Sequence, residues 1–392
     1  MDNGYCEEHG KRPIVCCATY QAYSIRETAY MRYLIFSITL FGLAFFPQIA
    51  ASSSPAGKAP QKAEFFGGIN TEYPSWFKES FLDFPEDLAE ATAAGKRLVI
   101  FFHQDGCPYC NALVERNFSQ KEIAEKAQKN FDIIAINMWG DRPITYLDGK
   151  QYTEKSFALK LKVQFTPTVI FFDEQGKVAL RINGYHSPQR FSLDLDYVAQ
   201  HKEKELPYRE FIRANAPATR TNKNLNPEPF FSKPPHDFSA KLGKRPIAVF
   251  FEQKDCPNCD LLHQKILPDR ELQAIIKQFD NVQLDMWSKT PLITFEGKKM
   301  TARDWAKKLK VEYAPSIVLF NPQGKEVIRT EAFFKVFHTQ GVFNYVLSEG
   351  YKREPSFQRY LTEYADHFRE QGKAVDIWRF ADEKLGERKP GE

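Results

Sequence analysis

Residues 101–110 read Phe-Phe-His-Gln-Asp-Gly-Cys-Pro-Tyr-Cys, and residues 250–259 read Phe-Phe-Glu-Gln-Lys-Asp-Cys-Pro-Asn-Cys. In both stretches an apolar run leads into two cysteines that are separated by two residues. The likeness continues at an offset of 148 or 149 residues throughout: it is 149 between Cys107 and Cys256 and 148 between Pro167 and Pro315. The other matching segments are Gly95–Arg97 with Gly243–Arg245, Met138-Trp139 with Met286-Trp287, Asp148–Lys150 with Glu296–Lys298, and Gln175–Lys177 with Gln323–Lys325. The chain is therefore a tandem duplication, and the cysteine pair that both copies keep is the best clue to its function.

Length and composition indicate a globular protein of several domains. A chain of 392 residues is long enough for two or three domains with cores of their own, and 43% of its residues are hydrophobic and 27% charged. The net charge of +4 is small for this length and no basic stripe is visible, which argues against a nucleic-acid partner. Of the seven cysteines, the four that follow residue 52 all belong to the two pairs. They therefore indicate chemistry and not a disulfide scaffold.

Residues 31–51 have the pattern of a secretory signal peptide. A short basic start at Met31 precedes the apolar stretch Leu34–Phe46 and a run of small residues, so we expect cleavage after Ala51. Residues 1–30 are polar and mixed, and we interpret them as an upstream extension, with translation starting at Met31. The alternative is an uncleaved membrane anchor. In both cases the remainder of the chain is expected to be exported, to a periplasm if the source is bacterial.

The order of predicted elements is the same in both copies and predicts an α/β fold, a mixed sheet with helices on both faces. We place the first domain at residues 65–213, a proline-containing linker at 214–240, and the second domain at 241–385. In the first copy we expect a helix over 85–94, a strand over 98–103, a helix from Cys107 to about Arg116, a helix capped by Ser119 and Glu122, a strand over 131–138, a hairpin over 144–152, a helix over 153–161, strands over 168–173 and 177–183, and helices over 188–200 and 206–213.

Two residues between the cysteines place both sulfurs on one face of a helix, at a separation that a disulfide can span. The first cysteine of each pair, Cys107 or Cys256, starts the helix, where backbone N–H groups stabilise a thiolate. The second, Cys110 or Cys259, lies one turn inside and can resolve a mixed disulfide. We therefore expect the first thiols to be exposed and the second ones to be more buried.

The dipeptides Thr166-Pro167 and Ala314-Pro315 stand just before a strand in each copy. Together with the apolar strand and the cysteine pair they resemble the thioredoxin superfamily. The first copy is particularly similar to the SoxW type, the thioredoxin-like proteins of bacterial sulfur-oxidation clusters, through residues 101–110, 137–141, 148–149 and 165–168. The resemblance implies two tandem thioredoxin-fold domains and disulfide exchange outside the cytoplasm. Carried over by position, Cys107 and Cys256 attack, Cys110 and Cys259 resolve, and Pro167 and Pro315 are cis prolines that border the substrate groove.

The chain departs from the family pattern at the position six residues before the first cysteine. Many thioredoxins have a buried carboxylate there, but this chain has Phe101 and Phe250. Glu252 and His103 are close in sequence to the cysteine pairs and could assist proton transfer there. The more ordinary interpretation is that each side chain is hydrogen-bonded within the fold or exposed to solvent. The direction of electron flow is left open.

We interpret the chain as an exported thiol–disulfide oxidoreductase that reduces or exchanges protein disulfides through its two Cys-x-x-Cys sites. Its partners would be protein disulfides and a membrane thiol carrier that supplies electrons, with no metal and no cofactor beyond the redox-active disulfides. Four alternatives stand beside this one. The four cysteines could bind zinc, the pairs could be structural disulfides, the second copy could be degenerate because Asp255 replaces Gly106, or the chain could be a thioredoxin-fold adaptor with vestigial cysteines.

Overall fold

Each repeat is built around a central strand that is buried on both faces. In the computed structural model, which describes residues 62–217 and 222–388, these strands are β2 (Arg97–His103) and β9 (Ile247–Glu252). Their sequences are almost continuously apolar, as is typical of strands that are covered by helices on both sides. The first sheet has the strand order β3-β2-β6-β7, and the second has β10-β9-β13-β14.

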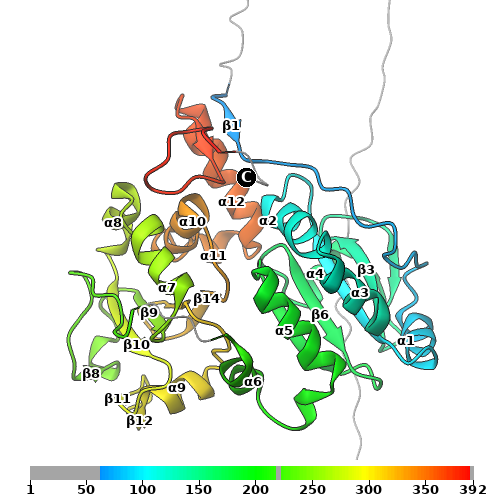
Figure 1. Cartoon of the computed structure of the whole chain (residues 1–392). Helices are drawn as coiled ribbons and strands as arrows, with labels where there is room; N and C mark the ends of the chain where they lie inside the picture. Colours follow the sequence, from blue (N-terminus) through cyan, green and yellow to red (C-terminus); the bar gives the residue numbers. More distant parts are fainter. Residues whose placement is uncertain (1–61, 218–221, 389–392) are drawn as a thin grey trace, which may run out of the picture. The chain divides into compact units, whose positions relative to one another are not determined.

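The two sheets have the same mixed topology. In the first repeat β2 runs parallel to β3 and antiparallel to β6, so that Phe101 lies opposite Ala135 on one side and Val169 on the other. In the second repeat β9 runs parallel to β10 and antiparallel to β13, and Phe250 has the equivalent position. The predicted α/β fold with a mixed sheet in each copy is confirmed (Figure 1).

The helices and strands follow the order that the sequence predicts. In the first repeat they are α1 (Phe84–Ala93), α2 (Pro108–Ala112), a π-helix (Leu113–Phe118), α3 (Lys121–Asn130), β3 (Phe131–Asn137), β4 (Pro143–Thr145), β5 (Gln151–Thr153), α4 (Glu154–Lys160), β6 (Thr168–Phe172), β7 (Val178–Asn183), α5 (Pro188–Ala199), a 3-10 turn (Lys202–Lys204) and α6 (Tyr208–Asn215). In the second repeat they are β8 (His236–Asp237), a 3-10 turn (Ser239–Lys241), α7 (Pro257–Leu261), a π-helix (Leu262–Ile266), α8 (Arg270–Ile276), β10 (Asp280–Asp285), β11 (Pro291–Ile293), β12 (Lys299–Thr301), α9 (Ala302–Lys308), β13 (Ser316–Phe320), β14 (Glu326–Thr330), α10 (Val336–Leu347), α11 (Gly350–Arg353) and α12 (Phe357–Glu370).

Helices cover both faces of each sheet because the residues of the central strand alternate between the faces. In the first repeat Phe101 faces the buried residues of α3 and α5, whereas Ile100 faces those of α1 and α4. The cluster around Phe101 does not end with the first repeat. It continues into the second, where it takes in Phe250 and the apolar residues of α8, α10 and α12. The two repeats therefore share one hydrophobic core on this side.

Short strands at the ends of the two repeats are joined to neighbouring strands. Strand β8, which lies in the segment predicted as a linker, runs parallel to β11, and Phe231 forms an isolated bridge with Asn281. Near the N-terminal end of the described chain, β1 (Phe65–Phe66) runs parallel to β15 (Val375–Asp376). The start of the first repeat is thus tied to the end of the second.

The predicted capping box of Ser119 and Glu122 is wrong. Helix α3 begins after Gln120, which has an extended backbone and makes no side-chain cap, and the Ser119 hydroxyl donates to the carbonyl oxygen of Glu115 over 2.6 Å. The hydroxyl bonds backward because the preceding π-helix extends to Phe118 and leaves that carbonyl available.

The predicted upstream extension (1–30), the signal peptide or anchor (31–51) and Cys6, Cys16 and Cys17 lie outside the described residues. Across 62–217 and 222–388, no helix combines the length and the apolar character that are needed to span a membrane.

Candidate functional site

The two cysteine pairs lie where each central strand passes into a helix, and both are disulfide-bonded. The Cα atoms are 5.3 Å apart for Cys107 and Cys110, and 5.2 Å apart for Cys256 and Cys259. The first cysteine of each pair is the N-cap of its helix, with an extended backbone and proline at the first helical position. Its sulfur accepts the backbone N–H of the second cysteine over 3.1 Å in both repeats. The same N–H stabilises negative charge on that sulfur in the reduced state.

A proline turn faces each pair. The peptide bonds that precede Pro167 and Pro315 are cis, as the sequence predicts. The Cys107 sulfur lies 3.5 Å from the carbonyl oxygen of Thr166, and the Cys256 sulfur lies 3.7 Å from that of Ala314. The structure therefore places the six residues that were singled out from the sequence in two sites, each with a cysteine pair and a cis-proline turn.

The residue before the first cysteine has the same backbone conformation in both repeats. Gly106 has φ = 70° and Asp255 has φ = 50°, both in the left-handed region. Aspartate tolerates this region better than most residues that have a Cβ atom. The replacement of glycine by aspartate in the second copy has therefore preserved the turn that presents the cysteine.

The expectation of exposed first cysteines is wrong for this disulfide-bonded state. Cys107 is 3% exposed and Cys256 is 5% exposed, while Cys110 and Cys259 are 0% and 1% exposed. In the first repeat Cys107 lines a pocket of about 320 Å³ to which both repeats contribute residues. From the second repeat the lining includes Phe334, Phe337, His338, Gln358, Leu361 and Thr362. Figure 1 shows α12 beside the start of α2, at this position.

The tryptophans of the repeated Met-Trp dipeptides are placed alike beside the two sites. Trp139 Nε1 donates to Gln104 Oε1, and Trp287 Nε1 donates to Gln253 Oε1, both over 2.9 Å. Trp139 lines the pocket next to Cys107, while both methionines of the dipeptides are buried core residues.

Each tryptophan ring is covered by guanidinium groups from the other repeat. Arg359 of α12 lies over Trp139, and Arg209 and Arg213 of α6 lie over Trp287.

The residues just before each cis proline are held by the other repeat. The ring of Phe165 lies 5.0 Å from that of Phe334, and the ring of Tyr313 lies 5.0 Å from that of His186. The helices α12 and α6 add one matching hydrogen bond each. These run from Phe357 N–H to Gln164 Oε1 over 3.0 Å and from Arg209 N–H to Glu312 Oε2 over 3.1 Å. Each repeat thus contributes residues to the surroundings of the other repeat's cysteine site.

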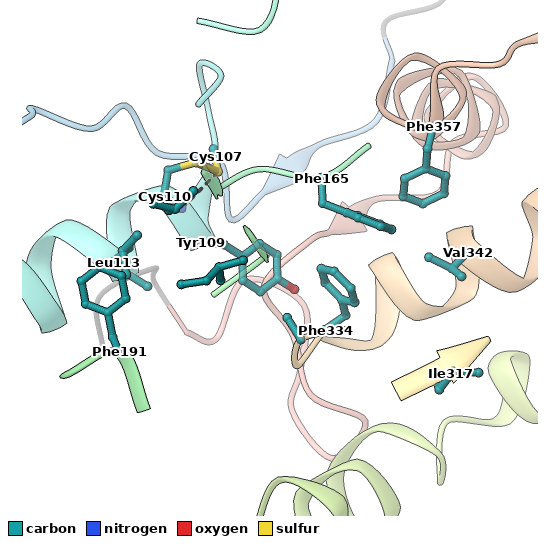
Figure 2. Close-up of a cluster of buried hydrophobic side chains, with 14 of the residues drawn as sticks. Cys107, Tyr109, Cys110, Leu113, Phe165, Phe191, Ile317, Phe334, Val342 and Phe357 are labelled. Atoms are coloured by element: carbon teal, nitrogen blue, oxygen red, sulfur yellow. Dashed lines mark hydrogen bonds between the residues drawn. A yellow bond between two sulfur atoms is a disulfide. The ribbon is translucent and has the colours of Figure 1, made fainter. Parts of the chain in front are cut away.

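Tyr109, which stands between the cysteines of the first pair, anchors that motif in the second repeat. Figure 2 shows its ring between the Cys107–Cys110 disulfide and Phe334. Its hydroxyl accepts the Lys335 N–H over 2.9 Å, and burial raises the pKa of this phenol well above its usual value. In the second pair the equivalent residue is Asn258, which donates to the hydroxyl of Tyr313 within its own repeat over 2.7 Å.

The position four residues before the first cysteine carries a buried titratable group in each repeat, with different partners. Glu252 is fully buried and accepts from His263 Nε2 over 3.0 Å, while Nδ1 of the same histidine lies 2.8 Å from Glu228. Burial alone lowers the pKa of His263, but the two carboxylates outweigh it and raise the pKa. In the first repeat burial lowers the pKa of His103 to about 4, and its ring packs 4.4 Å from that of Tyr73.

Sequence reasoning considered Glu252 but missed its partners His263 and Glu228. A comparison of the repeats at the fixed offset would have flagged His263, because Val114 occupies the equivalent position in the first copy. Among the described residues, the structure contains no group of three or more His, Cys, Asp and Glu side chains placed to hold a metal ion.

Comparison with known proteins gives one family match in both repeats. The model of a thioredoxin-like domain family matches residues 84–199 and 239–341. Mouse anterior gradient protein 3 is 27% identical over 126 residues, which cover 31% of this chain and 68% of that protein. A solved thioredoxin-fold protein from Helicobacter pylori is 20% identical, with a TM-score of 0.27 and coverage of 31% of this chain and 79% of that one. The C-terminal domain of Neisseria meningitidis DsbD in its oxidised form is 16% identical, with a TM-score of 0.23 and coverage of 31% and 98%.

Proposed function

The chain belongs to the thioredoxin-like domain family, and on that premise we propose that it is an exported thiol–disulfide oxidoreductase that reduces or exchanges protein disulfides at two sites. The observation that carries the proposal is the geometry shared by the two pairs. In each repeat the first sulfur receives a backbone N–H from the helix and faces the carbonyl group just before a cis proline. Export rests on the signal-like pattern of residues 31–51, and the particular similarity to the SoxW type stays a prediction.

The reaction that the geometry supports begins from the reduced pair. The Cys107 thiolate attacks one sulfur of a substrate disulfide, forms a mixed disulfide and releases the other substrate sulfur as a thiolate. The Cys110 thiolate then attacks the Cys107 sulfur, and the second substrate thiol leaves. Two electrons have passed to the substrate and the Cys107–Cys110 disulfide remains. A dithiol donor, which we propose to be a membrane thiol carrier, restores the reduced pair by the reverse exchange. Cys256 and Cys259 act in the same way in the second repeat.

The test is turnover of a disulfide-bonded protein, such as insulin, with dithiothreitol as the electron donor. Full-length protein would be compared with Cys107→Ala, Cys256→Ala and the double variant. We expect each single variant to keep part of the activity and the double variant to fall to the rate of the uncatalysed reaction. Because the buried carboxylate of many thioredoxins is replaced by Phe101 and Phe250, we expect a lower rate than that of an ordinary thioredoxin.

The alternative function, a thioredoxin-fold adaptor, is favoured by the burial of Cys107 and Cys256 at 3% and 5% exposure. An adaptor would bind partner proteins with both pairs permanently oxidised. If the wild-type protein and the double cysteine variant accelerate insulin reduction equally little, the adaptor function replaces the oxidoreductase.

A further inference from the structure

Another cavity, of about 170 Å³, lies between the two cysteine motifs. It adjoins the residues that stand between the two cysteines of each pair. It is lined by Tyr109 from the first motif and Asn258 from the second, and no cysteine contributes to its wall. The remainder of the wall includes Arg116 from the first repeat and Lys335, Trp378 and Arg388 from the second. The redox chemistry proposed above makes no use of this cavity.

All the charged side chains that line the cavity are positive. They are Arg116, Lys335 and Arg388, and no carboxylate lines the wall. Burial lowers the pKa of Lys335 to about 8. Glu383 acts against this shift, whereas the positive charges of Arg388 and Arg116 add to it, so both arginines repel the Lys335 ammonium group. Arg388 has a carboxylate partner, since its Nε lies 2.9 Å from Glu383.

Lys335 is held by neutral groups. Within the described part of the chain it forms no ion pair, and its ammonium group donates to the carbonyl oxygen of Trp378. The ammonium also lies 4.2 Å from the centre of the Trp378 ring and 4.0 Å from that of Phe380. A buried cation that has no direct ion pair is costly in a folded protein, and here Glu383 and Asp376 act on it only without direct contact.

Trp378, which lines the cavity, also carries a hydrogen-bond donor that has no acceptor in the described structure. Trp378 is 4% exposed, and its Nε1 is buried without a hydrogen-bond partner in the described structure. A buried donor of this kind destabilises the folded state unless an acceptor reaches it.

We propose that the cavity is a binding site for a small tetrahedral dianion, of the class of sulfate or phosphate. Three cations line a space that can hold such an ion, together with a tryptophan whose indole N–H is unpaired, and the charge of the ion would offset the repulsion among the cations. The bound ion would also strengthen the contact between the repeats, because Lys335 donates its backbone N–H to Tyr109 of the first motif. The site is independent of electron transfer, so its test needs no turnover.

Binding should weaken as the pH rises through about 8, since Lys335 then loses its charge. The other charged groups that act on Lys335 are Arg388 and Arg116, which lower its pKa, and Glu383 and Asp376, which raise it. The nearby phenols of Tyr109, Tyr185 and Tyr313 have raised pKa values and stay neutral.

The experiment uses the oxidised full chain in a chloride buffer of constant ionic strength at pH 7. Calorimetry and thermal unfolding would follow titration with sulfate, with phosphate and with acetate. We expect saturable binding and an increase in Tm with sulfate and phosphate. Equal responses to sulfate, acetate and chloride would overturn the proposal.

Variants then locate the site. Lys335→Met keeps an unbranched side chain of similar length and should weaken sulfate binding at least tenfold. Trp378→Phe removes the N–H and keeps an aromatic ring, and should weaken binding severalfold. Arg388→Gln changes a partly exposed side chain and gives a second measure if Lys335→Met does not fold. Lys289→Met, a matched change at an exposed lysine outside the cavity, should have no effect. If all the cavity variants bind sulfate as the wild type does, the cavity is not the site.

Discussion

Asn183 and Glu331, which occupy equivalent positions 148 residues apart, are hydrogen-bonded to each other: Asn183 Nδ2 donates to Glu331 Oε2 over 2.8 Å. The next pair along the chain, Gly184 and Ala332, is also in contact. Equivalent residues can meet in this way only on or near a local twofold axis. The matching ring contacts of Phe165 with Phe334 and of Tyr313 with His186 have the same relationship. The two repeats are therefore related by a pseudo-twofold axis that passes close to Asn183 and Glu331.

The contact at the axis leaves no room for a side chain on Gly184. A Cβ atom there would lie 2.5 Å from the Ala332 Cβ atom, and Gly184 has φ = +105°. Gly149 is a matched control, since it also has a positive φ, +73°, but nothing lies within 4 Å of its Cβ position. Gly184→Ala should therefore cost about 2 kcal/mol of unfolding free energy more than Gly149→Ala. Urea unfolding of both variants would measure the difference, and equal losses would contradict this close contact.

Acid should destabilise the fold through His338. Burial lowers its pKa to about 3, against an ordinary value of about 6.5 in the unfolded chain. The unfolded state binds the proton more readily, so the contribution of His338 is fully present above about pH 6.5 and is lost as the pH falls toward 3. Between pH 7.5 and pH 5 the wild type should lose about 2 kcal/mol more than His338→Phe, which does not titrate. Urea unfolding at the two pH values checks this, and parallel losses in both proteins would refute it.

The buried pair of Glu252 and His263 should be strongly coupled. Replacing His263 by Leu leaves the Glu252 carboxylate buried without its histidine partner, and should cost about 3 kcal/mol. The double variant Glu252→Leu with His263→Leu removes both polar groups and should be more stable than the sum of the two single changes predicts. A double-mutant cycle by urea unfolding gives this coupling. If the losses add, the two side chains are independent of each other.

Trapping of mixed disulfides should identify the attacking cysteines. In Cys110→Ala and in Cys259→Ala the resolving step is removed, so a partner should stay linked to Cys107 or Cys256. We expect the first repeat to trap more, because its Gly-Cys-Pro-Tyr-Cys run is closer to the pattern of active members of the family and a pocket adjoins its cysteine. Non-reducing gels followed by mass spectrometry of the linked peptides read out the result. If Cys107→Ala or Cys256→Ala instead traps partners on Cys110 or Cys259, the assigned roles of the two cysteines are reversed.

Much of the fold could be predicted from the sequence because its signals are local. The apolar runs at 98–102 and 247–251 identify the central strands, and the cysteine pairs followed by helical patterns identify the helices after them. Because the chain is duplicated, each pattern occurs twice, and each predicted element is supported by its counterpart in the other copy. The capping box failed for a local reason as well, since Ser119 had a nearer carbonyl acceptor in the π-helix that precedes it.

The burial of the site could not be predicted, because it depends on contacts that are remote in sequence. Gln104, three residues before Cys107, donates to Gln358 on α12, at a separation of 254 residues. Periodicity shows that α12 has an apolar face, but it does not show which surface this face covers. The same limit applies to Tyr109, whose partners Lys335 and Phe334 belong to the other repeat.

The meeting of equivalent residues at Asn183 and Glu331 is the arrangement by which identical subunits form a symmetric dimer. Here both halves belong to one polypeptide, so their association is intramolecular and does not depend on protein concentration. A dimer of identical chains must carry every substitution in both subunits, whereas a covalently linked one can change each half separately. Tyr109 and Asn258, or His103 and Glu252, are differences that a symmetric dimer could not have. One polypeptide can therefore carry two unlike redox centres and still keep the interface of a dimer.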